Sequence, residues 1–229
     1  MCGRYSNTRT KGDEVWARLA GRLGVALPES DAGFGRFNIA PTEEVVAAVD
    51  DQDGRRVAAL RWGLVPPWAE EAKPRFAMIN ARSETVLERP AYRGLIQEAA
   101  HRCLVLADGW YEWQGPEDPR QPRRPVHFAL ASGDPFCFAG LWARTSASCT
   151  ILTCTANELA RPIHDRMPVV LAEPAAWEAW LDPSLDGQAA AQLLAPLPSA
   201  ELSVRAANPV VNKAGHDGPD CLEPELTLL

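Results

Sequence analysis

Cys2 has the most distinctive chemistry in the chain, because it becomes the first residue once Met1 is removed. Methionine is generally trimmed when the next residue is small, and cysteine then carries a free α-amine beside its thiol. The pKa of an α-amine is ~8, against ~10.4 for lysine, so roughly a tenth of it is neutral at pH 7. An aldehyde can form an imine with this amine, and the thiol can close onto the same carbon to give a thiazolidine. The alternative is that Cys2 is a small buried residue or part of a disordered terminus.

Glu112 lies among three aromatic residues, Trp110, Tyr111 and Trp113, at the end of an expected strand. Desolvation raises the pKa of a carboxyl group, which would suit Glu112 to carry protons near neutral pH. The alternative is an exposed glutamate that alternates with core aromatics.

His164 lies in the proline-bracketed segment 160–168, between Arg161 and Arg166. The prolines and flanking charges predict a structured loop, and a histidine there can act as a general acid or base at physiological pH. A structural histidine is the alternative.

Other segments carry residues suited to a nucleic acid. Arg4 offers a guanidinium fork for phosphate. Asn80 and Arg82 share one face if their segment is extended. The Asn80 amide can orient an amine or hydroxyl group, and Arg82 can hold a second phosphate. Trp68 follows two prolines and can stack on an unpaired base, whereas core packing is the simpler interpretation for Trp62. The alternative for residues 78–84 is a turn before a helix cap.

These residues need a scaffold of short elements. Amphipathic spacing predicts a helix over residues 13–23 with Asp13 as its N-cap, and an Asp-Gly pair predicts a β-hairpin over residues 45–62. Apolar runs between turn residues predict strands over residues 103–113, 126–131, 135–141 and 149–155, and helices over residues 90–100, 174–181 and 188–194. The pattern favours an α+β fold, a single domain over residues 1–229 with an antiparallel β-barrel-like core flanked by short helices. We expect less order from about residue 200 onward.

The composition of the 229 residues, 46% hydrophobic and 23% charged, is typical of a soluble globular protein. No apolar stretch approaches the ~18 to 20 residues of a membrane span and the N-terminus has no signal-peptide core, so we expect a cytoplasmic protein with no membrane partner. The six cysteines are scattered, which favours reduced thiols. Cys149 and Cys154 have no matching second pair, so we predict no metal site and no cofactor.

The net charge of −7 argues at first against a nucleic-acid partner. Its distribution removes that objection. Residues 171–229 hold 2 basic and 9 acidic residues, a charge of −7, and residues 1–170 balance 21 basic against 21 acidic residues. The acidity is confined to the C-terminal part.

Six motifs occur in order along most of the chain, at residues 1–5, 37–42, 61–66, 80–84, 109–113 and 163–168. Together they resemble the SOS response-associated peptidase family, and the chain from about Glu173 onward adds little to the resemblance. The resemblance implies a monomer that senses abasic sites in single-stranded DNA, is nucleoid-associated when acting on DNA, and forms a thiazolidine crosslink through its N-terminal cysteine. Self-removal of Met1 accounts for "peptidase" in the family name, and an imine intermediate would permit a lyase activity.

The resemblance also implies roles for the residues singled out above. Cys2 would be the nucleophile, Asn80 would orient its amine, Glu112 would move protons, and His164 would assist ring opening and hydrolytic reversal. The implied DNA-binding residues are Arg4, Arg82 and Arg166 at phosphates and Trp68 at the gap in the strand. Recognition would then depend on backbone and shape instead of base sequence.

Two other functions fit the same residues. The first is a cysteine peptidase or amidohydrolase in which Cys2, His164 and Glu112 act on a protein or amide substrate. The second is a non-catalytic module that binds single-stranded nucleic acid. A residue before Cys2 that cannot be removed should abolish crosslinking, whereas a peptidase that uses only the thiol would survive it. For the binding module, Cys2→Ala should bind DNA as well as before, with no covalent product.

Overall fold

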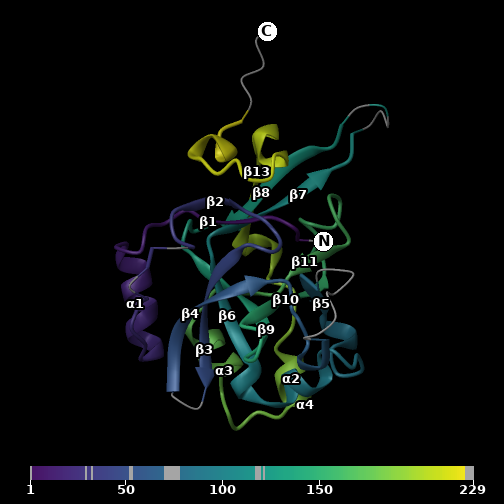
Figure 1. Cartoon of the computed structure of the whole chain (residues 1–229). Helices are drawn as coiled ribbons and strands as arrows, with labels where there is room; N and C mark the ends of the chain where they lie inside the picture. Colours follow the sequence, from purple (N-terminus) through teal and green to yellow (C-terminus); the bar gives the residue numbers. More distant parts are fainter. Residues whose placement is uncertain are drawn as a thin grey trace.

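The computed structural model describes residues 2–28, 30–31, 33–51, 54–69, 78–116, 120 and 122–224. More residues lie in strands than in helices, and short helices lie between groups of strands (Figure 1). The strands are β1 (Tyr5–Asn7), β2 (Arg36–Ile39), β3 (Glu44–Asp51), β4 (Gly54–Trp62), β5 (Asn80–Arg82), β6 (Arg102–Ala107), β7 (Gly109–Gln114), β8 (Arg124–Leu130), β9 (Phe136–Ala143), β10 (Ser148–Thr155), β11 (Arg166–Pro168), β12 (Val170–Leu171) and β13 (Leu202–Ala206). The α-helices are α1 (Glu14–Leu23), α2 (Arg93–Gln97), α3 (Pro174–Trp180) and α4 (Gly187–Gln192). The 3-10 helices are η1 (Pro67–Ala69), η2 (Ser83–Thr85), η3 (Ala99–His101), η4 (Ser199–Glu201), η5 (Pro209–Asn212) and η6 (Pro219–Leu222).

The larger sheet has eight strands and closes on itself through one short contact. Its path is β11-β10-β4-β3-β6-β9-β12, with β5 paired to β10 and β9 also paired to β10. The contact between β10 and parallel β4 covers two residue pairs, Ser148↔Arg61 and Cys149↔Trp62. The expected α+β fold is confirmed, and its core is a compact sheet assembly instead of a regular barrel.

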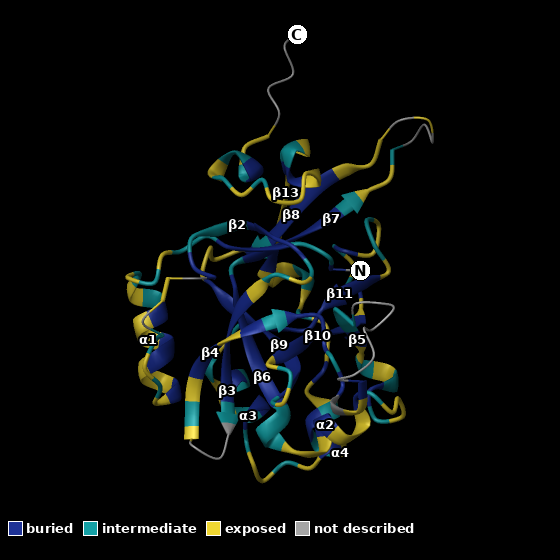
Figure 2. Ribbon diagram, in the orientation of Figure 1, coloured by how far each residue is buried: buried dark blue, intermediate teal, exposed yellow. Residues whose placement is uncertain are grey.

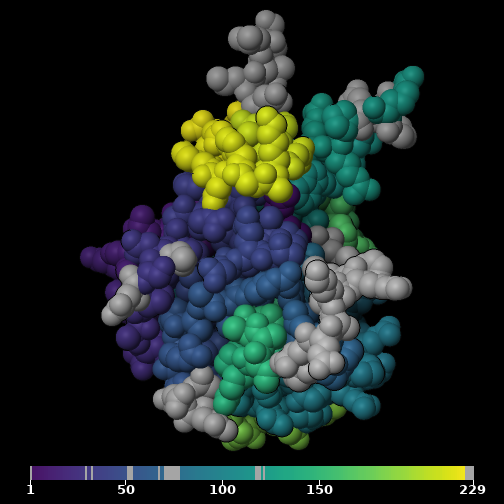
Figure 3. All heavy atoms as spheres, in the orientation of Figure 1, coloured from purple at the N-terminus to yellow at the C-terminus, as the bar shows by residue number. Residues whose placement is uncertain are grey.

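The smaller sheet, with the order β13-β8-β7-β1-β2, joins the two ends of the chain. β13 pairs with β8 from Leu202↔Leu130 to Ala206↔Val126. The sequence predicts less order beyond about residue 200, whereas η4, β13, η5 and η6 all lie there. In Figure 3 this yellow C-terminal segment packs against the purple and blue N-terminal part of the molecule.

The expected single strand over residues 103–113 is wrong, because it is two strands in different sheets. β6 belongs to the larger sheet and β7 to the smaller one, and the chain passes between them at Asp108. The Asp108 carboxylate accepts hydrogen bonds from Ser6 Oγ at 2.7 Å and from Thr8 N at 2.6 Å. Gly109 follows because a Cβ there would lie 2.1 Å from His127 Nε2. This crossing carries Glu112 out of the larger sheet and toward β1.

The hairpin of β3 and β4 is confirmed, and its register runs from Glu44↔Arg61 to Asp51↔Gly54. The expected turn residues 52–53 lie outside the described residues. β6 and β9 are buried along their whole length, as is β10 up to its last residue (Figure 2), because both faces of these strands are covered. One apolar cluster includes residues from both sheets, from Cys2 to Leu202.

The first predicted helix is confirmed as α1. The Asp13 carboxylate accepts from Val15 N at 3.1 Å, and Gly24 ends the helix at φ 67°, a backbone conformation that favours glycine. The helix expected over residues 90–100 is shorter: α2 ends at Gln97, and η3 follows. None of the described helices combines the length and the apolar character needed to cross a bilayer.

Candidate functional site

The candidate site lies where the two sheets meet at the start of the chain. Tyr111 N, on β7, donates to the Arg4 carbonyl at 3.0 Å, which aligns the strand carrying Glu112 with the first residues of the chain. From the larger sheet, Asn80 Nδ2 donates to the Cys2 carbonyl at 2.7 Å. The N label in Figure 1 accordingly lies beside β5 and β11. The two sheets therefore bring together residues that are far apart in the sequence.

Cys2 is fully buried. Its thiol lies 3.8 Å from the Arg4 carbonyl, to which it donates a weak hydrogen bond. Burial raises the pKa of this thiol well above its usual value, and the negative charge of Glu112 raises it further. The thiol is consequently neutral at physiological pH. Glu112 is near enough for its charge to influence the proton affinity of the thiol.

Glu112 is 4% exposed on β7. Burial raises the pKa of its carboxyl group to about 7, although the positive charge of the N-terminal amine lowers it, and the charge of Asp165 raises it slightly further. A carboxyl group with this pKa exchanges its proton near neutral pH, as a general acid and base must. Asp165 lies next to His164, so a charge in the His164 loop influences the proton affinity of Glu112.

Hydrogen bonds to the backbone of residues 79 and 80 hold Asn80 in place. Trp62 Nε1 donates to the carbonyl of the preceding Ile79 at 2.9 Å, and Tyr92 Oη donates to the Asn80 carbonyl at 3.4 Å. The Asn80 amide nitrogen is occupied by the Cys2 carbonyl. The amide oxygen is buried and has no hydrogen-bond partner among the described residues. This oxygen can accept a hydrogen bond from an amine at Cys2.

His164 lies in the loop between β10 and β11, and its ring is oriented by the backbone. Arg166 N donates to His164 Nδ1 at 3.0 Å, so the neutral ring carries its proton on Nε2. Asp165 Oδ1 is also 3.0 Å from Nδ1, a contact that favours the protonated ring. Burial nevertheless lowers the pKa of His164, so the neutral ring with a donor at Nε2 predominates at pH 7.

The expected DNA-binding residues fall into two groups. Arg4 and Arg166 are turned inward: Arg4 donates to Asn38 Oδ1 at 3.0 Å, and Arg166, which is 7% exposed, donates to both carboxylate oxygens of Glu84 at 2.5 and 2.9 Å. Arg166 also donates to the Thr153 carbonyl. The hydrogen bonds that Arg166 donates to Glu84 lower the pKa of the Glu84 carboxyl group to about 2. Both arginines therefore stabilise the fold around the site.

Trp68 and Arg82 form the second group, and both are exposed. Trp68, at 70% exposure, lines a surface hollow of about 430 Å³ together with Arg82, Arg89, Tyr92 and Asn80. We call this the Trp68 hollow. Because Asn80 also contacts Cys2, the hollow adjoins the buried site.

Sequence reasoning missed Arg89 and Asp165. Arg89 is exposed and adds a second cation to the Trp68 hollow, but it lies outside every motif, so only the fold reveals it. Asp165 lies inside the His164 segment and could have been identified as a neighbour of that histidine. Its electrostatic effect on Glu112 arises only in the folded chain, because the two residues are far apart in the sequence.

Comparisons with known proteins find relatives over nearly the whole chain. A family model described as "SOS response associated peptidase (SRAP)" matches residues 1–214. The chain is 33% identical to the abasic site processing protein YoqW of Bacillus subtilis, over 97% of this chain and 99% of that protein. It is 28% identical to the abasic site processing protein YedK of Escherichia coli, over 98% of this chain and 100% of that protein. A crystal structure of a Bacteroides thetaiotaomicron protein has the same fold, with a TM-score of 0.81 at 23% identity over 98% of this chain and 100% of that one.

Proposed function

Because the chain belongs to the SOS response-associated peptidase (SRAP) family, we propose that it processes abasic sites in DNA, the activity that their names give to YoqW and YedK. The substrate is an abasic site in single-stranded DNA, whose ring-opened sugar carries an aldehyde at C1′. The product is a thiazolidine crosslink between that carbon and Cys2. The crosslink shields the lesion during replication.

The observation that carries this proposal is the buried pair of Cys2 and Glu112. A thiolate peptidase needs a thiol whose pKa is lowered by a neighbouring cation, and burial beside a carboxylate does the opposite at Cys2. A neutral thiol suits a mechanism in which the α-amine attacks first and the thiol closes the ring afterwards. The same site residues thus support aldehyde chemistry better than peptide hydrolysis of another protein.

The first step makes the imine. Removal of Met1, which we assign to the protein itself, frees the Cys2 amine, and the Glu112 carboxylate accepts its ammonium proton. The pKa of about 7 at Glu112 is close to that of an α-amine, so this transfer is nearly balanced. The amine nitrogen bonds to C1′ and passes one proton to the carbonyl oxygen, which becomes the carbinolamine hydroxyl group. Glu112 then returns its proton as this hydroxyl group leaves as water, and takes up the proton that the nitrogen loses as the imine forms. The Asn80 amide oxygen accepts an N–H bond and orients the lone pair toward C1′.

The second step closes the ring. The Cys2 sulfur bonds to the imine carbon, the C=N π electrons move to nitrogen, and the thiol proton reaches that nitrogen through Glu112. His164 acts before and after these steps: its Nε2–H donates a hydrogen bond to the ring oxygen of the closed sugar as the ring opens, and to the oxygen that the attacking water places on C1′ in hydrolytic reversal. The imine also permits strand cleavage by elimination of the 3′ phosphate, and ring closure removes that intermediate.

The Trp68 hollow holds the DNA next to the lesion. Trp68 stacks on a base beside the gap, and Arg82 and Arg89 contact phosphates. Arg4 and Arg166 contribute phosphate contacts of smaller effect, because a phosphate has to compete with Asn38 at Arg4 and with Glu84 at Arg166. The protein acts as a monomer on this strand.

A denaturing gel with a Cys2→Ser variant tests the order of the steps. The parent protein should give a heat-stable adduct with single-stranded DNA containing one abasic site, and little with intact or fully duplex DNA. Cys2→Ser keeps an α-amine but lacks the thiol, so its adduct should survive only after borohydride reduction of the imine. The proposal would be overturned if Cys2→Ser gave a heat-stable adduct without borohydride, or if the parent protein gave no adduct.

A further inference from the structure

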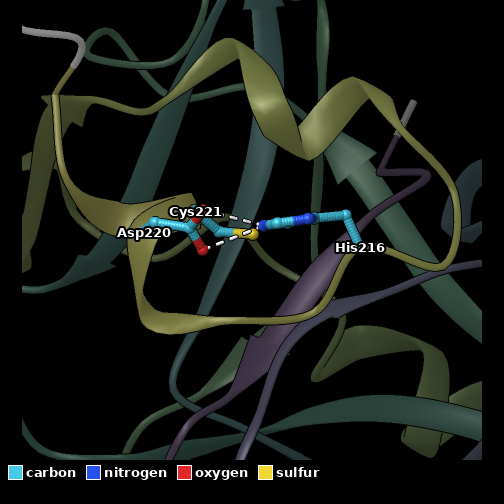
Figure 4. Close-up of side chains that lie close together, drawn as sticks. All are labelled: His216, Asp220 and Cys221. Carbon is cyan, nitrogen blue, oxygen red and sulfur yellow. Dashed lines mark hydrogen bonds and ion pairs between the residues drawn. The ribbon is translucent and has the colours of Figure 1, made fainter.

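A cluster of possible metal ligands lies in the C-terminal segment, apart from the Cys2 site. His216, Asp220 and Cys221 come from η6 and the loop before it, and each offers one donor atom within 4.8 Å of the others. Figure 4 shows the His216 ring pointing at the Asp220 carboxylate, with the Cys221 sulfur beside them. The three donors are an imidazole nitrogen, a carboxylate oxygen and a sulfur, a set typical of zinc sites.

The spacing of the donor atoms can be compared with that of a tetrahedral zinc site. His216 Nε2 is 2.9 and 2.8 Å from the two carboxylate oxygens of Asp220. Zinc bonds of ~2.0 to 2.3 Å place neighbouring donors roughly 3.3 to 3.8 Å apart, so His216 and Asp220 need to separate by about half an ångström. The Cys221 side chain is fully buried, whereas the side chains of His216 and Asp220 are 36% and 46% exposed. An ion can therefore enter from the solvent side and reach the sulfur beneath.

The backbone that carries these side chains is fixed. Asn38 Nδ2 donates to the His216 carbonyl at 2.7 Å, and the Asp217 carboxylate accepts from Asn38 N at 2.9 Å. At the other end, Asn208 N donates to the Cys221 carbonyl at 3.1 Å. Ligands on an anchored backbone lose less conformational freedom when they bind an ion, which favours binding.

We propose that His216, Asp220 and Cys221 bind a divalent transition-metal ion of the zinc class, with water at the fourth position. The Cys221 thiol releases its proton to solvent on binding, and the ion bonds to the resulting thiolate. The ion fastens the loop of residue 216 to η6. Arg4, two residues after Cys2, donates to Asn38 Oδ1 and, at 2.9 Å, to the Val211 carbonyl. An ion that stabilises the C-terminal segment therefore also stabilises the position of Arg4.

Cobalt binding provides the test, because a cobalt–thiolate bond gives a charge-transfer absorption band. The 1,2-aminothiol at Cys2 is a competing chelate, so the titration uses full-length Cys2→Ala protein with reduced thiols. We expect a thiolate band that saturates at one equivalent of cobalt and disappears when zinc displaces the cobalt. The band should be absent in Cys221→Ser, and the affinity for cobalt should fall at least tenfold in His216→Gln. His101→Gln, which changes a histidine outside the cluster, should bind as the parent does.

Zinc should also raise the melting temperature of Cys2→Ala by about 5 °C or more at 100 times its dissociation constant. Asp220→Asn serves if Cys221→Ser fails to fold, since it keeps the side-chain shape and removes the charged ligand. No saturable thiolate band in folded protein, or a band that persists in both Cys221→Ser and His216→Gln, would overturn the proposal. Neither outcome depends on crosslinking to DNA, so the metal site and the proposed function can fail separately.

Discussion

The Cys2 site and the Trp68 hollow share Asn80 but use opposite environments. At the Cys2 site, burial shifts the pKa of the thiol and of Glu112, so the chemistry depends on the exclusion of water. In the Trp68 hollow, an exposed tryptophan and arginines remain in contact with solvent, where they can bind a flexible strand. Changes at the first region should therefore alter bond formation, and changes at the second should alter affinity.

The largest effect is expected for Cys2→Ala. It removes the thiol, so stable adduct should fall below detection, because an imine alone hydrolyses. Binding to a stable abasic analogue without an aldehyde should change less than about twofold, since Cys2 is buried and does not line the Trp68 hollow. Gel assays and fluorescence anisotropy measure the two quantities. A large loss of affinity would contradict the division between the regions.

The next effect is expected for Glu112→Gln, which should slow crosslinking by about 10²- to 10⁴-fold, the usual contribution of a general acid or base. In the parent the rate should rise with pH through about 7 as Glu112 ionises, and the Gln variant should lose that step. Single-turnover rates from pH 5 to 9 provide the measurement.

Stability supplies the control for this variant. The folded pKa of Glu112 lies above its ordinary value of 4.5, so ionisation opposes folding as the pH rises from about 4.5 through 7. Glu112→Gln should therefore melt higher than the parent above pH 7 and similarly below pH 4. A variant that is slower because it is less stable at pH 8 would contradict the proton-transfer role.

His164→Ala should slow reversal of the crosslink by about 10²-fold while initial binding stays within twofold. The reason is that the neutral ring carries its N–H at Nε2, which can donate a hydrogen bond as the ring reopens. Release of purified crosslink into excess competitor aldehyde measures the rate. Equal release from the parent and the variant would remove this role from His164.

Trp68→Ala tests the exposed region. It should weaken binding of the stable abasic analogue by about 1–3 kcal/mol, the typical value of one base stacked on an aromatic side chain. The crosslinking rate at saturating DNA should stay within about threefold of the parent. Titration by fluorescence anisotropy gives the affinity, and a lowered saturating rate with unchanged affinity would place Trp68 in the chemistry instead.

The smallest effect distinguishes the two groups of arginines. Arg82→Ala should lower the slope of log affinity against log salt by ~0.7, as expected for one lost phosphate contact on a single strand. Arg166→Gln should lower this slope by less than Arg82→Ala does, and should also lower the melting temperature, because it breaks the ion pair between the buried Arg166 and Glu84.

Arg22→Ala, an exposed position on α1, is the matched control for charge and should alter neither quantity. A larger change of slope for Arg166→Gln than for Arg82→Ala would show that the inward arginine opens to meet DNA.

Sequence reasoning predicted the local elements and the chemistry better than the connections. Asp13 and Gly24 mark the ends of α1 by caps that can be seen in the sequence, and alternating apolar runs indicated β3, β4, β8, β9 and β10. The break at Asp108 was missed because the apolar pattern continues through it. The reason for Gly109, the proximity of His127, exists only once β7 and β8 are paired.

The site shows the same limit. Motif residues Cys2, Asn80 and Glu112 carry recognisable functional groups, and the fold places them together. The inward orientation of Arg166 depends on Glu84, which approaches it through the pairing of β5, β10 and β11. The cluster at residues 216–221 has no repeated ligand pair, so a search for zinc spacing did not find it. Long-range pairing decides which charged groups remain available.

Mass spectrometry of the N-terminal peptide from protein crosslinked to abasic single-stranded DNA tests the central claim most directly. We expect a peptide that begins at Cys2, carries the sugar fragment with the loss of one water, and has a thiol that iodoacetamide no longer alkylates. An adduct on another residue, a retained Met1 in the adduct, or an alkylatable Cys2 thiol would contradict a bond from both nitrogen and sulfur to C1′.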